Sequence, residues 1–188
     1  NVISFDALSN FSEISKIHKN FQPHHFDVIL TNPPFGAKID DAKEEYLKKY
    51  NLAKKITKGV VKNRDSQKTE VLFIERCIDF VKPGTGRIAI VLPDGVLTNI
   101  SMQYVRDYIL ERCEILGVVS LPVFAFSHYG AGVKPSIVFL RRKTDDEKLI
   151  NYKIFMALAD HIGYDATGRD DPLNDLPEIC VKFHEFLK

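Results

Sequence analysis

The 188-residue chain has no tryptophan and only three cysteines, Cys77, Cys113 and Cys180. The cysteines lie far apart and form neither a CxxC pair nor a Cys/His spacing typical of zinc ligands, so we expect no metal site. Sparse cysteine in an odd number also fits buried thiols in a reducing compartment. The cysteine content therefore predicts a protein of the cytoplasm.

Long apolar runs and an excess of one charge are also lacking. No stretch approaches the ~18 uninterrupted apolar residues of a membrane span, so we expect no membrane segment. Lys and Arg number 26 against 25 Asp and Glu, a net charge of +1. A chain this close to neutral does not coat nucleic acid through bulk charge, and any such contact must be a local patch.

The first residues also lack the features of a natural start. The chain begins with Asn1 instead of methionine, and the residues that follow do not form a charged and then apolar signal peptide. We therefore expect an internal piece of a longer protein. Hydrophobic residues at 45% and charged residues at 27% predict that this piece is globular.

The apolar pattern alternates between strand and helix signals. Residues 2–5 and 26–31 are short apolar runs, and Pro33 and Pro34 must end the second one because proline cannot continue a ladder. Strand after helix after strand predicts an α/β protein with a parallel sheet. Further helices are expected at 14–21, 69–81 and 100–109, and further strands at 88–92, 116–121, 137–140 and 150–156.

Two segments depart from this pattern. Residues 38–68 hold ten Lys or Arg against five Asp or Glu; such a stretch is commonly a solvated face, but it follows a candidate site directly and could contact phosphates. Residues 159–188 turn acidic and contain Pro172 and Pro177. We therefore expect one catalytic-type domain over residues 1–158 and an acidic tail or linker over 159–188.

The sequence Asn32-Pro33-Pro34-Phe35 follows the second predicted strand and carries the clearest chemistry. The prolines fix the backbone and remove two N–H donors, so the Asn32 amide oxygen and the Pro33 carbonyl are rigid acceptors without a donor beside them. Two acceptors suit an –NH2 group, and Phe35 adds a planar face. An acceptor pair beside a stacking ring is what a flipped nucleobase requires.

These residues resemble the Asn-Pro-Pro-Phe motif of methyltransferases that act on the N6 amino group of adenine. The longer pattern resembles the methylase subunit of type I restriction-modification systems, over the C-terminal part of its catalytic domain and essentially the whole chain. The blocks that carry this second resemblance are the helix from Thr69, Pro83-Gly84 and residues 87–93, 121–124, 132–134, 162–165 and 175–177.

The resemblance implies a Rossmann-like methyltransferase sheet with S-adenosylmethionine as cofactor. Asn32, Pro33, Pro34 and Phe35 would be the catalytic residues. Asp6, in a block similar to the family's acidic one, would accept a hydrogen bond from the adenine amino group of the cofactor. Phe124 resembles the aromatic that stacks on the target base opposite Phe35, with Phe126 as the alternative if Phe124 belongs to the core.

One departure from the family concerns the cofactor side. The family's glycine-rich block and ribose-binding acid lie upstream and are absent, and Gly84-Thr85-Gly86 stands between a helix and a strand, in the wrong order for such a loop. The resemblance thus implies an incomplete sheet without its first strands. We expect the chain alone to be inactive, and its exposed sheet edge to favour self-association.

The resemblance also implies partners and leaves alternatives. The partners would be double-stranded DNA and the specificity and restriction subunits of the same system. Protein glutamine N5-methyltransferases use a similar Asn-Pro-Pro turn, with Tyr more often as the aromatic and without the trailing blocks. A non-catalytic module that holds DNA or a specificity subunit is the alternative outside enzymes.

Overall fold

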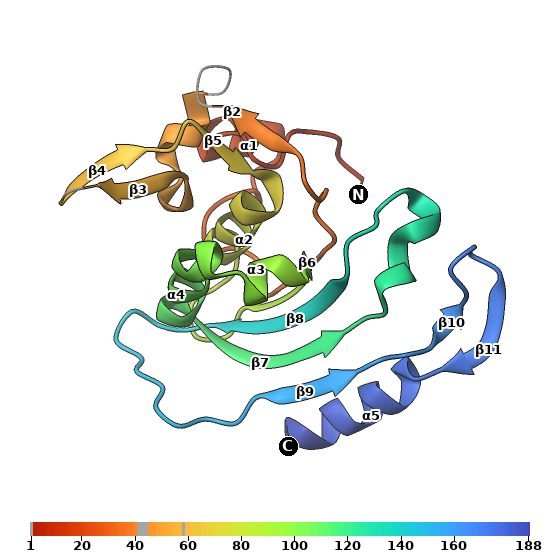
Figure 1. Ribbon diagram of the computed structural model, residues 1–188. Helices are drawn as coiled ribbons and strands as arrows, with labels where there is room; N and C mark the ends of the chain where they lie inside the picture. Colours follow the sequence, from red (N-terminus) through yellow and green to blue (C-terminus); the bar gives the residue numbers. More distant parts are fainter. Residues whose placement is uncertain (1, 41–44, 58) are drawn as a thin grey trace.

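The computed structural model describes residues 2–40, 45–57 and 59–188, which form a five-stranded sheet with helices on both faces (Figure 1). Strand β6 is parallel to β1, and β7 is parallel to β9, but β8 runs antiparallel to both β6 and β7. In order, the strands are β1 (Val28–Thr31), β6 (Arg87–Pro93), β8 (Pro135–Arg142), β7 (Cys113–Ser120) and β9 (Phe155–Leu158).

The prediction of an α/β methyltransferase-type sheet is confirmed, but the expectation of purely parallel strands is wrong. Parallel neighbours need a crossover connection, usually a helix packed on the sheet. The link from β7 to β8 holds only the 3₁₀ helix η4 (Val123–Tyr129) and a loop, so the chain returns antiparallel. This return places η4 near the end of β1 that carries the Asn32 motif.

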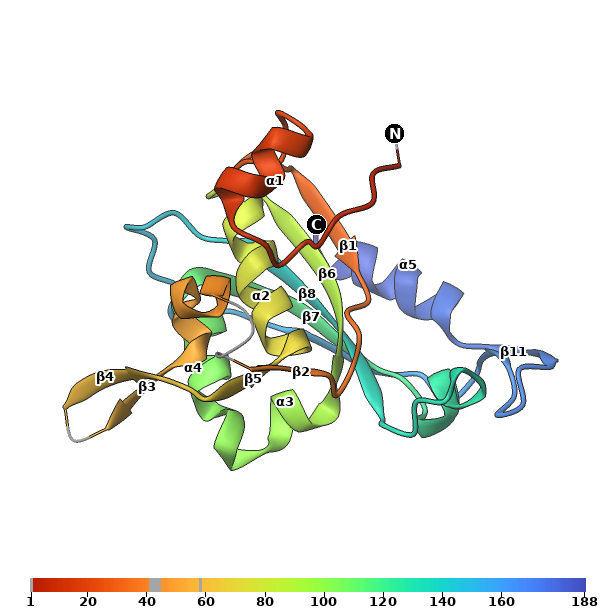
Figure 2. The ribbon, with the colours of Figure 1, turned by 90° about the horizontal axis from the view of Figure 1, so that it is seen from above.

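Helices α2 (Thr69–Phe80) and α4 (Gln103–Arg112) cover one face of the sheet (Figures 1 and 2), and the chain passes from β6 into α4 through α3 (Asp94–Thr98) and η3 (Ile100–Met102). Alternate residues of β6 point toward these helices, as the pleat of a strand requires. The core so formed includes Ile88, Ile90 and Leu92 of β6, Val71, Ile74 and Ile78 of α2, and Val105 and Ile109 of α4, all at most 3% exposed.

The lysine-rich segment 38–68 forms short strands instead of one periodic element. Strand β2 (Lys38–Asp40) pairs antiparallel with β5 (Ser66–Lys68), and β3 (Lys54–Thr57) pairs antiparallel with β4 (Val60–Asn63). The β3–β4 ribbon projects from the body of the protein (Figures 1 and 2). The 3₁₀ helices η1 (Glu45–Lys49) and η2 (Asn51–Ala53) anchor the segment through a second small core that also contains Leu8 and Leu72.

Near the N-terminus, one strand prediction is wrong and one helix prediction is confirmed only in part. Residues 2–5 form no strand, because a strand exists through ladder bonds to a neighbour and no strand of the described residues lies beside them. Helix α1 (Phe11–Ile17) ends before Phe21, whose ring instead packs 4.7 Å from that of Phe5. The helix predicted over 14–21 is thus present as far as Ile17, and Phe21 makes an aromatic contact with Phe5 instead.

Strand β1 forms one edge of the sheet within the described residues. It pairs with β6 on one side only, and its Val28 and Leu30 side chains are 56% and 78% exposed. An apolar edge strand with unpaired backbone groups is a template for pairing with another strand. Whether a second copy of the chain covers this edge stays a prediction.

Residues 159–188, expected to form a tail, fold back onto the sheet. Strands β10 (Ile162–Tyr164) and β11 (Asp170–Asn174) make a hairpin, and α5 (Leu176–Phe186) lies on the face opposite α2 (Figure 1). The Phe183 ring of α5 stands 4.8 Å from the ring of Phe139 and 5.1 Å from that of Phe155, where β9 begins, five residues later than predicted. The division at residue 158 stays a prediction.

Neither a membrane-spanning helix nor a metal cluster is found in the described part of the chain. None of its helices is both long and apolar enough to cross a membrane. No group of three or more His, Cys, Asp or Glu side chains there could hold a metal ion.

Candidate functional site

A pocket of about 570 Å³ opens at the carboxyl end of β1. One wall is the Asn-Pro-Pro-Phe loop, residues 32–36, and the other wall is Phe126 with residues 129–133 from the link between β7 and β8. The carboxyl end of a strand is where α/β proteins place ligands. All four predicted catalytic residues, Asn32, Pro33, Pro34 and Phe35, therefore line one cavity.

The start of α2 fixes the shape of this loop. The Thr69 hydroxyl donates a hydrogen bond to the Pro34 carbonyl at 2.9 Å, and the Gly36 N–H donates to the Glu70 carboxylate at 3.3 Å. Gly36 has φ +77°, a conformation that glycine adopts without steric cost. Thr69 and Glu70 are buried, so the loop is held from beneath and its outer side is left for a ligand.

The two predicted acceptors carry no partner from the protein. Among the described residues, no side chain or backbone N–H donates to the Asn32 amide oxygen or to the Pro33 carbonyl. The Asn32 side chain is exposed at the pocket, while Pro33 is buried. The Asn32 amide oxygen and the Pro33 carbonyl thus lie next to the Phe35 ring, and no donor of the described residues competes with a ligand for them.

Phe126 and Tyr129, and not the predicted Phe124, are the aromatic residues of the opposite wall. The rings of Phe35 and Phe126 meet edge to face, with centroids 6.4 Å apart and planes at 81°. Phe124 is half-buried against the apolar cluster of Val119 and Ala125 and does not line the pocket. Phe126 lies at a kink in η4, where its backbone is not helical (φ −123°, ψ 17°), and the sequence does not show this kink.

Asp94 stabilises the wall opposite the Asn-Pro-Pro-Phe loop. The sequence did not identify this residue. It follows β6, and its carboxylate accepts a 2.6 Å hydrogen bond from the Ser136 hydroxyl and lies 3.7 Å from the Lys134 ammonium group. Its backbone N–H donates to the Lys134 carbonyl at 2.9 Å. The only signal was a carboxylate directly after a buried strand, at the edge where ligands bind.

Asp6, the predicted cofactor residue, lies outside this pocket. Its carboxylate accepts the Leu8 N–H at 2.9 Å and so shapes the turn before α1. Its neighbour Ala7 lines an apolar pocket of about 310 Å³ together with Thr31, the residue before Asn32. The neighbours of the two predicted residues thus line one apolar cavity, and the role of Asp6 toward a cofactor stays a prediction.

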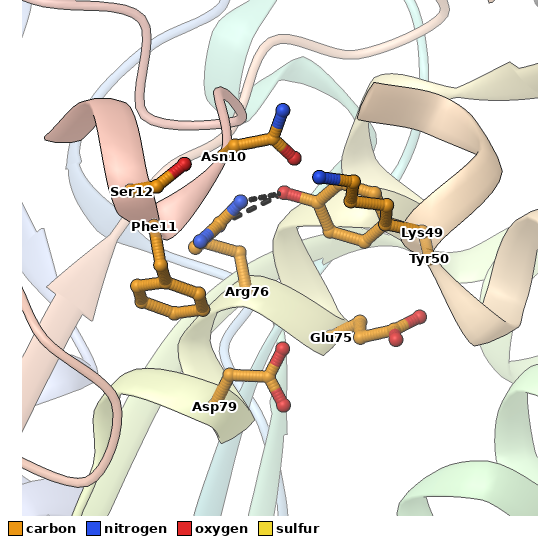
Figure 3. Close-up of a pocket in the computed structure, with 8 residues that line it drawn as sticks. All are labelled: Asn10, Phe11, Ser12, Lys49, Tyr50, Glu75, Arg76 and Asp79. Carbon is orange, nitrogen blue, oxygen red and sulfur yellow. Dashed lines mark hydrogen bonds between the residues drawn. The ribbon is translucent and has the colours of Figure 1, made fainter. Parts of the chain in front are cut away.

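A second polar pocket, of about 250 Å³, lies between α1, η1 and α2 around Arg76 (Figure 3). Arg76 is 3% exposed; it donates hydrogen bonds to the Tyr50 hydroxyl and to the carbonyls of Leu8 and Ser9. Its Nη1 is buried without a hydrogen-bond partner in the described residues. The guanidinium ties the N-terminal segment to α2, which is a structural role.

Burial perturbs the acidic groups around Arg76. It raises the pKa of Tyr50, and it raises that of Asp79 from 3.8 to about 6, with help from the charge of Glu75. Burial also raises the pKa of the Cys77 thiol to about 12. A thiol of that kind stays neutral and unreactive near pH 7, so Cys77 is no nucleophile.

Sheet order, helices on both faces and an Asn-Pro-Pro-Phe loop at a strand end together define a Rossmann-like methyltransferase fold. The model of the family described as N-6 DNA Methylase matches residues 6–184. The chain belongs to the N-6 DNA methylase family.

A curated relative agrees with this assignment. The chain is 32% identical over 117 residues to the methylase subunit of the type I restriction enzyme EcoEI from Escherichia coli. The match covers 62% of this chain and 21% of that protein, so the chain spans only about a fifth of the relative's length.

Solved structures show the same fold. A putative class I S-adenosylmethionine-dependent methyltransferase from Listeria monocytogenes superposes with a TM-score of 0.63 at 23% identity, over 89% of this chain and 44% of that one. A chain from a type I restriction-modification complex gives 0.63 at 22% identity, over 98% and 32%. At these identities, the likeness concerns the fold alone.

Proposed function

We propose that the protein transfers a methyl group from S-adenosylmethionine to N6 of an adenine in DNA, as part of a type I restriction-modification methylase. The observation that carries this proposal is the pair of acceptors, Asn32 and Pro33, which have no partner in the described protein and stand beside the Phe35 ring. Family membership and the E. coli relative support the same chemistry.

The acceptor pair is suited to an amino group that must become a nucleophile. The nitrogen of an adenine amino group has its lone pair delocalised into the ring. The Asn32 oxygen and the Pro33 carbonyl accept its two hydrogens, which draws the nitrogen toward tetrahedral geometry and localises the lone pair. Because Thr69 and Glu70 fix the loop beforehand, these acceptors need no reorganisation during the reaction.

The pocket also suits a base that has left the duplex. N6 is paired inside double-stranded DNA, so the adenine must be extruded before it can react. A cavity of about 570 Å³ lies within the range of ligand sites, ~300–1,000 Å³. Phe35 and Phe126 offer aromatic rings from opposite walls, at 81° to each other, and the base could stack on one of them.

The residues present fit one end of the cofactor. S-adenosylmethionine, when bound, supplies an electrophilic methyl group on a positively charged sulfur. The exposed Asp6 carboxylate would accept a hydrogen bond from the cofactor's adenine amino group, as the family resemblance implies. The apolar cavity between Ala7 and Thr31 would then lie against the cofactor's ring.

The partners follow from the same assignment. Target DNA, a specificity subunit and a restriction subunit would assemble with the protein, in the cytoplasm. Because a separate subunit would choose the DNA site, the pocket needs to recognise only the target adenine.

The test compares methyl acceptors. The complete gene product, mixed with its specificity subunit and labelled S-adenosylmethionine, should place label in DNA as N6-methyladenine. A peptide that offers a glutamine side chain should stay unlabelled. Label in the peptide instead of the DNA would make the protein a glutamine methyltransferase, and label in neither, with DNA still bound, would make it a binding module.

A further inference from the structure

Four of the described lysines in segment 38–68 are arranged in two facing pairs. In the β2–β5 ladder Lys38 stands opposite Lys68, and in the β3–β4 ribbon Lys55 stands opposite Lys62. Like charges directly opposite each other destabilise a pair of strands. An anionic partner would offset the repulsion between the facing ammonium groups of these two pairs.

The carboxylates of the protein offset this repulsion only in part. Lys55 lies 3.8 Å from Asp65, and Lys68 lies 3.8 Å from Glu70, both longer than a hydrogen bond. Lys38 and Lys62 are exposed and have no ion-pair partner among the described residues. These ammonium groups are therefore open to a ligand.

The pairs lie on a path that begins at the Asn32 pocket. Gly36 lines the pocket, and Lys38 follows two residues later at the start of β2. Strand β5 continues back through Arg64 into β4, and the β3–β4 ribbon extends this arm away from the body (Figure 2). Lys68 follows Lys62 by six positions, at most ~20 Å of extended chain. That length matches about six base pairs of duplex, at ~3.4 Å each.

We propose that the β2–β5 ladder and the β3–β4 ribbon form a track for the DNA backbone, with Lys38, Lys55, Lys62 and Lys68 on phosphates beside the extruded adenine. The proposal rests on the proposed function and specifies which surface holds the duplex. A two-stranded ribbon of this kind is narrow enough to enter a DNA groove. The contacts are to phosphates, so they position the DNA and do not read its sequence.

The experiment measures how DNA affinity depends on salt. Fluorescence anisotropy of a labelled 30-base-pair duplex is recorded with the 188-residue chain between 50 and 200 mM NaCl. The slope of log affinity against log salt falls by about one for each phosphate-binding lysine that is neutralised. The variant Lys55→Gln/Lys62→Gln should lower this slope by about two on every DNA sequence, and Lys38→Gln should lower it by about one.

Two controls make the result specific. Lys55→Arg/Lys62→Arg keeps the charges and should keep the slope. Lys148→Gln/Lys153→Gln removes two exposed lysines after β8, which runs antiparallel to β6 and so ends at the side of the sheet away from the pocket; it should behave as wild type.

An unchanged salt slope in the Gln variants would contradict the proposed track for the DNA backbone. A wild-type chain without DNA affinity at 50 mM NaCl would contradict it as well. If the Gln variants instead lose binding of a specificity subunit and keep the slope, the ribbon is a protein-docking surface and the proposal is also wrong. The proposed function is judged separately, by methyl transfer and its loss in Asn32→Ala.

Discussion

The ring of Phe35 meets the ring of Phe126 edge to face across the pocket, at 6.4 Å between centroids and 81° between planes. Phe35 follows β1 and Phe126 belongs to η4, so the contact closes the pocket between two distant segments. An aromatic pair of this geometry contributes ~0.5–1.5 kcal/mol beyond its buried area. A base that enters must therefore replace this contact by stacking on at least one ring.

Replacement of Asn32 by alanine should nearly abolish methyl transfer. The change removes one of the two acceptors that hold the amino group, and loss of one preorganised polar group costs ~10²–10³ in rate. Methyl incorporation into DNA by the complete gene product measures the effect. Asn174→Ala, on the β10–β11 hairpin, serves as the control, and a rate for Asn32→Ala within tenfold of wild type would contradict the role of Asn32.

Removal of an aromatic ring from either wall should weaken base extrusion. Stacking contributes ~1–3 kcal/mol per base and tolerates any ring, so Phe35→Ala and Phe126→Ala should lower the signal of a fluorescent base analogue at the target position, while Phe35→Tyr retains it. Phe124→Ala is the matched control: Phe124 and Phe126 pack against the same apolar cluster, so both changes should lower the melting temperature, but only Phe126 lines the pocket. A larger decrease of extrusion in Phe124→Ala than in Phe126→Ala would reverse the assignment.

The 188-residue chain alone should bind S-adenosylmethionine weakly or not at all. The Asp6 carboxylate would supply one hydrogen bond, a net ~0.5–1.5 kcal/mol, whereas micromolar affinity needs about 8 kcal/mol. Isothermal titration measures this directly. Micromolar binding would show that the glycine-rich block absent from this sequence is not required.

The exposed edge of β1 should make the chain self-associate. Val28 and Leu30 are large apolar side chains on an edge strand, and a second copy could pair with its free backbone groups. Light scattering should report a species larger than a monomer, and Leu30→Lys should return it toward the monomer mass. A wild-type chain that stays monomeric at high concentration would contradict self-association through the edge of β1.

Ionisation of Asp79 should lower stability as the pH rises. Its pKa in the folded protein, about 6, lies above the ordinary 3.8, so the folded state holds the proton more tightly. The stability this confers is complete below about pH 4 and is lost as the pH rises through 6. Asp79→Asn should therefore gain about 1 kcal/mol over wild type between pH 5 and pH 8, measured by urea unfolding.

Asp170→Asn provides the comparison for this pH dependence, because Asp170 is exposed on β11. Its stability relative to wild type should not change between the two pH values. If the free energy of unfolding depends on pH equally in wild type and Asp79→Asn, ionisation of Asp79 does not destabilise the folded protein.

The sequence alone determined the alternation of helix and strand and the residues of one wall of the site. The run 26–31 followed by two prolines forced a strand end with a rigid polar loop, and local chemistry is enough for that inference because backbone restriction by proline is a property of the chain itself. The same holds for α2, whose apolar spacing and terminal Pro83-Gly84 predicted its length within a residue.

Only the tertiary structure decided what faces this loop. Three features depend on contacts between segments distant in sequence: the antiparallel return of β8, the position of Phe126 instead of Phe124 in the pocket wall, and the hydrogen bond from Ser136 to Asp94. The same is true of residues 159–188, whose acidic composition suggested a tail but whose Phe183 packs on the sheet. The composition of a segment indicates only how polar it is on average. A few apolar side chains at the right spacing decide where the segment packs.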